Sequence, residues 1–226
     1  MSDPSYMARK AILSAILPLT AFDGWTAKTL RAAVKNTDLP EGAGALYFPD
    51  GPLEVIRFWS DEMDLQVEEM LGALNLPEMK IRDKVTQGVL ARFNAIGPHE
   101  EAARRALARL TILDAAGQGP AQLWAAADTI WRAIGDTSTD ANYYSKRTIL
   151  SAVIGTSLAA WLGDETVEKT EGRKFLDARI ANVMQFEKAK WEFKNKTKDW
   201  PSPAAILGRL RYGRRPRRRR SRRSSL

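Results

Sequence analysis

The hydrophobic periodicity of this chain constrains its fold more than any other feature. In the segment PLEVIRFWSDEMDLQVEEMLGALN, residues 52–75, Ile56, Met63 and Val67 share one helical face, whereas Asp61 and Glu68 fall mainly elsewhere. This spacing is typical of an amphipathic α-helix. The same period recurs in residues 5–17, 26–36, 77–95, 99–112, 120–134, 140–162 and 166–195. Because strand-like alternation is absent, we predict an all-α fold with about nine helices.

Composition limits the chemistry that the chain can perform. Its 226 residues can bury a sizeable core without disulfides, and it has no cysteine. The single histidine, His99, stands at an expected helix start, in GPHEE. Thiolate zinc sites and histidine-rich metal sites are therefore excluded, and we expect neither a metal site nor an enzyme.

The charge of the chain is concentrated at its C-terminal end. The formal net charge is +8, yet ten arginines lie between Arg209 and Arg223, and the rest of the chain carries 25 basic and 27 acidic residues. The body is therefore not a nucleic-acid binder by bulk charge. Pro201 and Pro203 mark the change of character, so we expect a short amphipathic segment and an arginine-rich disordered tail in residues 199–226.

Two apolar stretches raise the question of membrane insertion. The first, in MSDPSYMARKAILSAILPLTAFDGW, superficially resembles a signal peptide but lacks a clear cleavage site, and Pro18 interrupts it, so we predict a first core helix that ends there. The second, residues 148–163, has 16 uncharged residues, fewer than a bilayer span normally needs. We expect no membrane-spanning helix.

Residues 10–57 resemble the helix-turn-helix of TetR-type regulators. TAKTLRAAVKN fits the second helix, and Tyr47 and Phe48 match the aromatic end of the third. A DNA reader needs basic or amide side chains for phosphates and base edges. No basic residue occurs between Lys35 and Arg57. We therefore expect specific DNA binding to be lost, and a ligand-sensing TetR-type repressor is the alternative function.

The segment GDTSTDANYYSKR, residues 135–147, is unusually rich in hydrogen-bonding groups. A calcium loop is excluded because Ala141 and Arg147 replace the required Gly and Glu. Catalysis is disfavoured because no histidine lies nearby in sequence. Two interpretations stay open. In the first, Thr137 or Ser138 caps the following helix and Asp140 complements its N-terminal dipole. In the second, the segment is a docking surface in which Tyr143 and Arg147 act as interface anchors.

A longer resemblance bears on that choice. The stretch IWRAIGDTSTDANYYSKRTILSAVIGTSLAAWL, followed by FLDARIANVMQFEKAK, is similar to the ubiquinone-biosynthesis accessory protein family, and LTAFDGWTAKTLRAAV and LYFPDGPLEVIRFW fit the same family. The resemblance implies a TetR-like, non-catalytic protein that binds isoprenoid lipid and presents a quinone precursor to a di-iron hydroxylase. It also implies that the docking patch is formed by Asp140, Asn142, Tyr143, Tyr144 and Arg147. Ala141 and Tyr143 depart from the residues usual in the family.

A cavity for a prenyl chain needs apolar walls. We expect those walls to come from residues in three helical segments: Leu123, Trp124, Ala127, Ile130, Trp131, Ile149, Leu150, Val153, Ile154, Leu158, Ile180, Val183 and Met184. The same residues describe an ordinary filled core equally well. The small residues Ala152, Gly155 and Ala159 admit either a ligand or a closely packed helix.

The tail is expected to contact an anionic membrane surface, because each basic residue near an anionic leaflet contributes about 1 kcal/mol. The contact residues would be Trp200, Ile206, Leu207, Arg209, Leu210 and Arg211. Nucleic acid is the rival partner, since polyarginine attracts any polyanion.

The expected organisation has three parts: a degenerate helix-turn-helix region in residues 1–52, a lipid-binding and partner-docking domain in 53–198, and the tail in 199–226. We expect a cytoplasmic protein, peripheral on a bacterial inner membrane. No cofactor is expected beyond bound isoprenoid lipid or phospholipid. Its partners would be the hydroxylase and the quinone precursor, and a homodimer is the assembly we consider.

Overall fold

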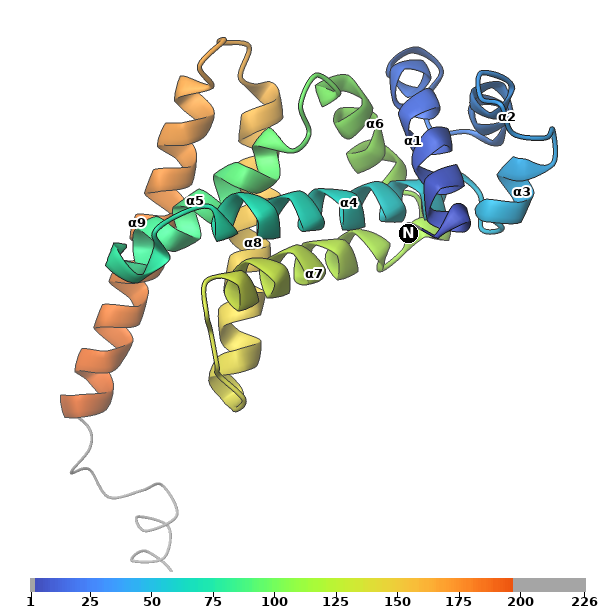
Figure 1. Cartoon of the computed structure of the whole chain (residues 1–226). Helices are drawn as coiled ribbons and strands as arrows, with labels where there is room; N and C mark the ends of the chain where they lie inside the picture. Colours follow the sequence, from blue (N-terminus) through green and yellow to red (C-terminus); the bar gives the residue numbers. More distant parts are fainter. Residues whose placement is uncertain (1–2, 197–226) are drawn as a thin grey trace, which may run out of the picture. The chain divides into compact units, whose positions relative to one another are not determined.

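The computed structural model describes the backbone of residues 3–196 and the side chains of residues 3–185. Within that range it contains nine α-helices and no strand, which confirms the predicted all-α fold (Figure 1). The helices are α1 (Pro4–Asp23), α2 (Ala27–Lys35), α3 (Ala43–Tyr47), α4 (Pro52–Gly72), α5 (Ile81–Asn94), α6 (Glu100–Leu110), α7 (Gln118–Ala133), α8 (Ala141–Gly163) and α9 (Thr170–Lys196). Two short 3₁₀ turns, Leu76–Glu78 and Leu113–Ala115, precede α5 and α7.

The chain divides into two compact units, residues 1–183 and 184–226. The described part of the second unit is the end of α9, residues 184–196. All the packing described below belongs to the first unit. The sequence-based boundaries after residues 52 and 198 stay predictions, and the second lies outside the described residues.

Helix α1 extends further than its sequence predicts. It begins at Pro4, where the Asp3 side chain accepts a hydrogen bond from the Ser5 amide, and continues through Pro18 to Asp23. The expectation that Pro18 ends it is wrong. Pro18 removes only one backbone donor, and both Pro18 and Ser14, four residues earlier, are exposed. Meanwhile Ile16, Leu17 and Thr20 stay buried on the opposite side, so packing carries the helix past the proline.

The N-terminal helices are fixed to α4 and α6 by aromatic contacts. Trp25 stacks on Trp59 of α4 with ring centroids 5.8 Å apart, and its indole nitrogen donates to the Ala102 carbonyl of α6 at 3.0 Å. The Arg9 guanidinium lies 4.6 Å from the ring centres of both Phe48 and Phe58. The helix-turn-helix region therefore shares one core with the helices that follow it.

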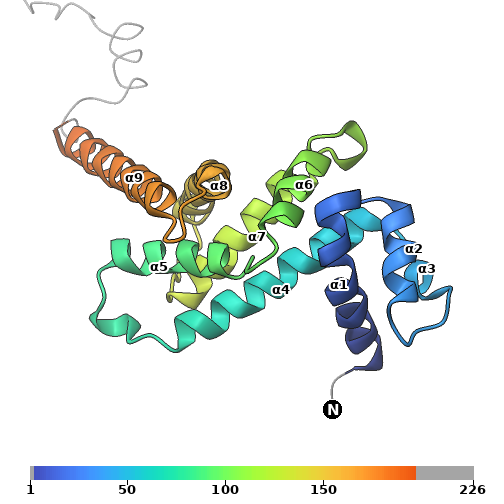
Figure 2. The same ribbon diagram turned by 90° about the horizontal axis from the view of Figure 1, so that it is seen from above.

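Helix α4 runs beside α5 and α7, and α7 packs along α8 (Figures 1 and 2). Two glycines allow close approach. A Cβ on Gly88 of α5 would lie 2.6 Å from Ile130 of α7, and a Cβ on Gly155 of α8 would lie 3.0 Å from Leu123 of α7. Gly155 thus admits a neighbouring helix, while Ala152 and Ala159 are exposed.

The connection from α8 to α9 is organised by Asp164. Its carboxylate accepts hydrogen bonds from the Gly172 amide at 2.9 Å and from the Thr166 amide and hydroxyl at 2.9 and 2.7 Å. These bonds lower the pKa of Asp164 to about 2, the Gly172 amide having the largest effect. The start of α9 is thereby fixed beside Trp161, which packs against Phe93 of α5.

Candidate functional site

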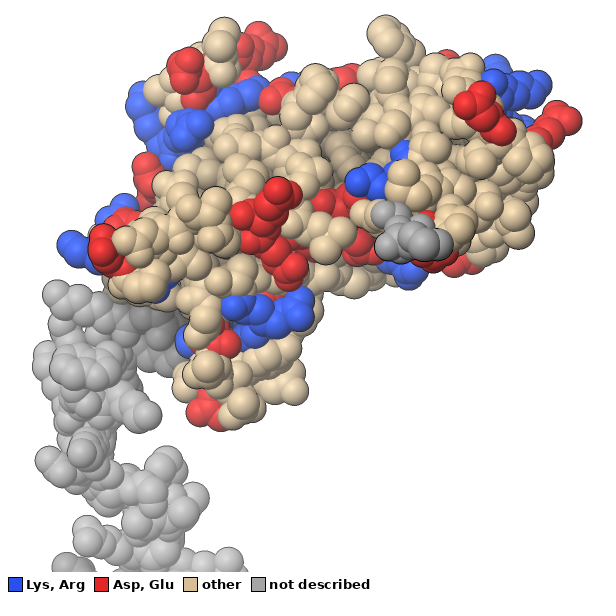
Figure 3. Space-filling model, in the orientation of Figure 1, with Lys and Arg blue, Asp and Glu red and all other residues tan. Residues whose placement is uncertain are grey.

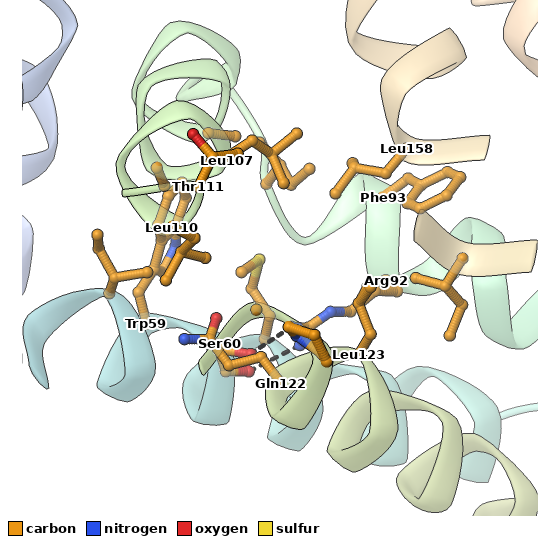
Figure 4. Close-up of a pocket in the computed structure, with 18 residues that line it drawn as sticks. Trp59, Ser60, Arg92, Phe93, Leu107, Leu110, Thr111, Gln122, Leu123 and Leu158 are labelled. Carbon is orange, nitrogen blue, oxygen red and sulfur yellow. Dashed lines mark hydrogen bonds between the residues drawn. The ribbon is translucent and has the colours of Figure 1, made fainter. Parts of the chain in front are cut away.

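Helices α4 to α8 enclose a cavity of about 270 Å³ (Figure 4). Its wall is mostly aliphatic and aromatic. The lining residues are Ile56, Trp59, Ser60 and Met63 of α4; Arg92 and Phe93 of α5, with Ile96 after it; Ala103, Ala106, Leu107 and Leu110 of α6, with Thr111 after it; Gly119, Pro120, Gln122 and Leu123 of α7; and Ile154 and Leu158 of α8.

The cavity opens at the connection between α6 and α7. Of its lining residues only Thr111 and Pro120 are exposed, and they flank this connection. Between them, Ile112 and Leu113 are exposed to 54% and 91%, an unusual degree for large apolar side chains. The connection next to the exposed part of the wall therefore carries exposed apolar side chains.

One end of the cavity is polar, and we call Ser60, Arg92 and Gln122 its polar end. Figure 4 places the three side chains together, across the cavity from Leu107 and Thr111. The Arg92 guanidinium donates to the Ser60 carbonyl and to Asp64 at 2.7 Å each, and to the Ser60 hydroxyl at 2.6 Å. The Gln122 amide nitrogen is buried and has no hydrogen-bond partner among the described residues.

Burial dominates the electrostatics of this end. It lowers the pKa of Arg92, an effect that the neighbouring Asp64 and Asp61 oppose. Burial also raises the pKa of Asp64 to about 6, although the Arg92 charge lowers it in part. Asp64 therefore titrates close to neutral pH while it is paired with Arg92.

The cavity and the expected lipid-binding residues overlap only in part. Leu123, Ile154 and Leu158 line it. Ala127, Ile130, Leu150, Val153 and Ile180 are buried core residues away from the cavity wall. The others also lie off the wall: Trp124, Trp131, Ile149 and Val183 are partly exposed, and Met184 is 44% exposed and belongs to the second unit. The alternative of a filled core thus describes most of this set.

Sequence reasoning missed the contributions of α4, α5 and α6 to the wall. An apolar stripe looks the same whether it faces a cavity or a filled core. One usable signal was present: Ser60 and Arg92 are polar residues within apolar helical faces. A buried arginine needs acceptors, so its position marks a place where packing is not purely apolar.

The expected docking residues fall into an exposed and a buried group. Tyr144 is 64% exposed, and its ring lies 5.1 Å from that of Tyr143 and 6.3 Å from that of Trp124. Asp140 and Asn142 are exposed, and the Asp140 carboxylate accepts from the Asn142 amide at 2.9 Å, which caps α8. A side chain of this segment therefore caps α8, as the capping interpretation predicted, but the capping residue is Asp140 and not Thr137 or Ser138. An accessible aromatic surface lies beside it.

Arg147 is buried, with 2% of its surface exposed. Its guanidinium contacts Asp128 at 2.5 Å and Asp136 at 3.2 Å and lies 3.5 Å from the centre of the Tyr143 ring. Lys146 also contacts Asp136, at 2.5 Å. We call Asp128, Asp136, Lys146 and Arg147 the α7–α8 cluster. Much of the polar character of residues 135–147 thus serves to fix the turn between two helices.

The pKa values in the cluster reflect this pairing. For Asp136, burial alone would raise the pKa, but hydrogen bonds from Lys146, Ser138 and Arg147 lower it below its usual range. For Arg147, burial would lower the pKa, but Asp128 and Asp136 raise it. Both groups therefore stay charged at neutral pH.

The helix-turn-helix region has few of the features that contact DNA. Helix α3 has only five residues and no side-chain cap, and no basic residue lies between Lys35 and Arg57. On the face that Figure 3 shows, basic and acidic side chains are interspersed and form no continuous basic surface. The basic side chains that this face shows are thus not arranged as the continuous surface that a run of phosphates would need.

The expected membrane residues, Trp200, Ile206, Leu207, Arg209, Leu210 and Arg211, lie outside the described residues. Among the helices that are described, none is both long enough and apolar enough to cross a bilayer.

The arrangement of α1 to α9 defines a TetR-like helical protein. A TetR transcriptional regulator from Nitrosomonas europaea ATCC 19718 superposes with a TM-score of 0.65 over 78% of this chain and 98% of that one, at 15% identity, a level at which the likeness concerns the fold alone. The predicted resemblance to a ubiquinone-biosynthesis family with this fold is confirmed: the COQ9 family model matches residues 116–187.

Individual relatives extend that match along the chain. The ubiquinone biosynthesis protein COQ9-A, mitochondrial, of Xenopus laevis is 28% identical over 183 residues, 78% of this chain. The COQ9 proteins of Homo sapiens and Rattus norvegicus are each 26% identical over 179 residues, 76% of this chain. The aligned region spans 56–57% of the length of these three relatives.

Proposed function

We propose that this chain is a non-catalytic accessory protein of ubiquinone biosynthesis. It binds an isoprenoid lipid and presents a prenylated quinone precursor to the membrane-associated di-iron hydroxylase. One observation carries this proposal: a chain similar to COQ9 proteins encloses a largely apolar cavity with an opening. The hydrocarbon part of a lipid is stabilised when it moves from water into such an apolar cavity.

The size of the cavity limits what it holds. Its volume of about 270 Å³ is near the lower end of the ~300–1,000 Å³ usual for ligand pockets. With about 30 Å³ for each water in the liquid, it corresponds to roughly nine waters. It therefore accommodates a ring or a short prenyl segment, and the rest of a long tail extends through the mouth.

Lipid binding is tested by native mass spectrometry of protein purified from its host. The wild-type protein should retain a prenyl quinone or a phospholipid. Ala106→Phe fills the cavity and should lose that lipid without losing thermal stability, whereas Ala108→Phe, on the exposed side of the same helix, should keep it. Wild-type protein free of lipid would contradict the proposal. The same spectra report whether the chain is a homodimer.

Partner docking is assigned to the surface around Tyr144, together with Asp140 and Asn142. Tyr144→Ala should weaken capture of the hydroxylase about tenfold or more, as expected for an aromatic interface anchor, with an unchanged melting temperature. Phe22→Ala removes another exposed aromatic side chain, on α1, and is the control. Equal capture by both variants would leave Tyr144 with no role beyond its contacts with Tyr143 and Trp124. Arg147 is a poor probe, because its substitution also disrupts the α7–α8 cluster.

Membrane association is assigned to the tail, with nucleic acid as the rival partner. Removal of residues 200–226 should abolish sedimentation with vesicles that contain anionic lipid and leave thermal unfolding unchanged. Sedimentation of the truncated protein equal to that of the full chain would refute the role of the tail. Binding to duplex DNA at the same salt concentration, without binding to vesicles, would favour the rival.

A further inference from the structure

The polar end of the cavity contains more hydrogen-bonding capacity than the protein uses. A guanidinium has five N–H groups. Arg92 directs three of them to protein acceptors, at the Ser60 carbonyl, the Ser60 hydroxyl and Asp64. The other two have no acceptor among the described residues. The buried amide nitrogen of Gln122 adds two more unpaired N–H groups.

An unpaired buried donor costs about 1–3 kcal/mol, and the Gln122 amide nitrogen is such a donor in a side chain that lines the cavity. A guest that accepts a hydrogen bond there would remove this cost. A hydrocarbon guest alone would leave the Gln122 amide unpaired. A guest with an oxygen atom at its end would offer an acceptor to this polar end, while its apolar part contacts Phe93, Leu107 and Leu158.

Charge decides between a neutral and an anionic guest. The Arg92 guanidinium is already paired with Asp64 at 2.7 Å, with side chains only 10% and 14% exposed. A carboxylate or phosphate guest would add a second negative charge to this buried pair and leave the site with a net charge. A carbonyl or hydroxyl oxygen avoids that cost and accepts a charge-assisted hydrogen bond.

We propose that the polar end binds the head of a neutral amphiphile, whose carbonyl or hydroxyl oxygen hydrogen-bonds with Arg92 and Gln122. The apolar remainder points to the mouth between α6 and α7, where Ile112 and Leu113 are exposed. This inference rests on the proposed lipid-binding function and adds the chemical class and the orientation of the guest.

Three small probes with one skeleton test the proposal: 4-propylphenol, propylbenzene and 4-propylbenzoate. Dissociation constants are measured by isothermal titration calorimetry on full-length protein after removal of copurified lipid. The wild-type protein should bind the phenol on the order of tenfold more tightly than propylbenzene, the effect expected of a hydrogen bond to a charged donor. The benzoate should bind no more tightly than propylbenzene.

Gln122→Leu removes the amide at nearly constant size and should reduce the preference for the phenol severalfold, with propylbenzene bound equally well or better. Gln118→Leu, one turn earlier on α7 and outside the cavity wall, is the matched control and should keep the wild-type preference. Gln122→Met provides a second substitution if the leucine variant folds poorly, as judged by thermal unfolding.

The outcomes separate this inference from the proposed function. Equal binding of phenol and propylbenzene by the wild-type protein, tightest binding of the benzoate, or an unchanged preference in both Gln122 variants would overturn the polar end as a head site while lipid copurification still stands. Failure to bind any probe also overturns it. If the wild-type protein carries no lipid from its host either, the proposed function fails as well.

Discussion

Two arginines are buried among the described residues, and they differ in what surrounds them. Arg147 lies between two carboxylates and under a tyrosine ring, and its pKa is raised although burial alone would lower it. Arg92 pairs with one carboxylate at the edge of a cavity, and burial lowers its pKa. Each guanidinium donates three hydrogen bonds to protein acceptors, but Arg147 pairs with two carboxylates in the α7–α8 cluster, whereas Arg92 pairs with one and borders the cavity.

This difference separates a structural element from a binding site. A buried ion pair with excellent geometry is costly to break, because the partner left behind is an unpaired charge. A buried charge whose side chain lines a cavity can instead donate hydrogen bonds to a guest. We expect the α7–α8 cluster to fix the turn that leads into α8, on which Tyr144 lies, and the polar end to distinguish among lipids.

The largest expected effect is the loss of Arg147. Arg147→Met leaves Asp128 and Asp136 without their shared partner, and should lower the free energy of unfolding by about 3–5 kcal/mol, measured by urea denaturation. Arg132→Met removes another arginine that contacts Asp128, but one whose side chain is 60% exposed, so its loss should stay below about 1 kcal/mol. Similar losses for the two variants would show that burial of Arg147 contributes nothing.

A smaller loss, about 2 kcal/mol at pH 7, is expected for Arg92→Met, since Asp64 can take up a proton. The folded-state pKa of Asp64, about 6, exceeds the unfolded value near 3.8, so ionisation of Asp64 lowers stability as pH rises from about 4 to 6. Without Arg92 that pKa rises further. The loss should therefore be larger at pH 8 than at pH 5, as measured by urea denaturation at both values.

Arg147→Met gives a different pH comparison. The folded-state pKa of Asp136 lies below its unfolded value, so its contribution to stability is present above about pH 4 and is lost only as pH falls further. In Arg147→Met the hydrogen bonds from Lys146 and Ser138 remain and keep the pKa of Asp136 low, so the loss should be similar at pH 5 and at pH 8. If the loss in free energy of unfolding changed with pH in the same way in Arg92→Met and Arg147→Met, the proposed difference between the polar end and the α7–α8 cluster would be wrong.

The smallest expected effect is on the melting temperature when a methyl group is added beside the cavity wall, where a side chain can move to make room. In Gly155→Ala the new Cβ meets the end of the Leu123 side chain at 3.0 Å, and Leu123 can shift into the cavity, so the melting temperature should fall by only about 1–3 °C, less than 1 kcal/mol. In Gly88→Ala the Cβ would lie 2.6 Å from Ile130, which is fully buried away from the cavity, so we expect a larger fall. Equal falls would indicate a wall as rigid as the core.

Much of the fold was predictable from local pattern. Helical periodicity placed most helices to within a few residues, because each amphipathic face repeats along the chain. Pro18 was the exception, since the buried neighbours that carry α1 past it come from other helices. The site was harder: only Leu123, Ile154 and Leu158 of the expected wall line the cavity, and Arg147, expected at a surface, is buried against Asp128 of the preceding helix.

The sequence by itself determined the helical class, the TetR-like order of the helices and the separation of the arginine-rich tail from a nearly neutral body, because these follow from periodicity and composition. The tertiary structure decided which apolar faces close on each other and which leave a space. It also decided which buried arginine pairs with two carboxylates and which one borders the cavity. Both depend on residues far apart in the chain, such as Ser60, Arg92 and Gln122, whose proximity no local pattern encodes.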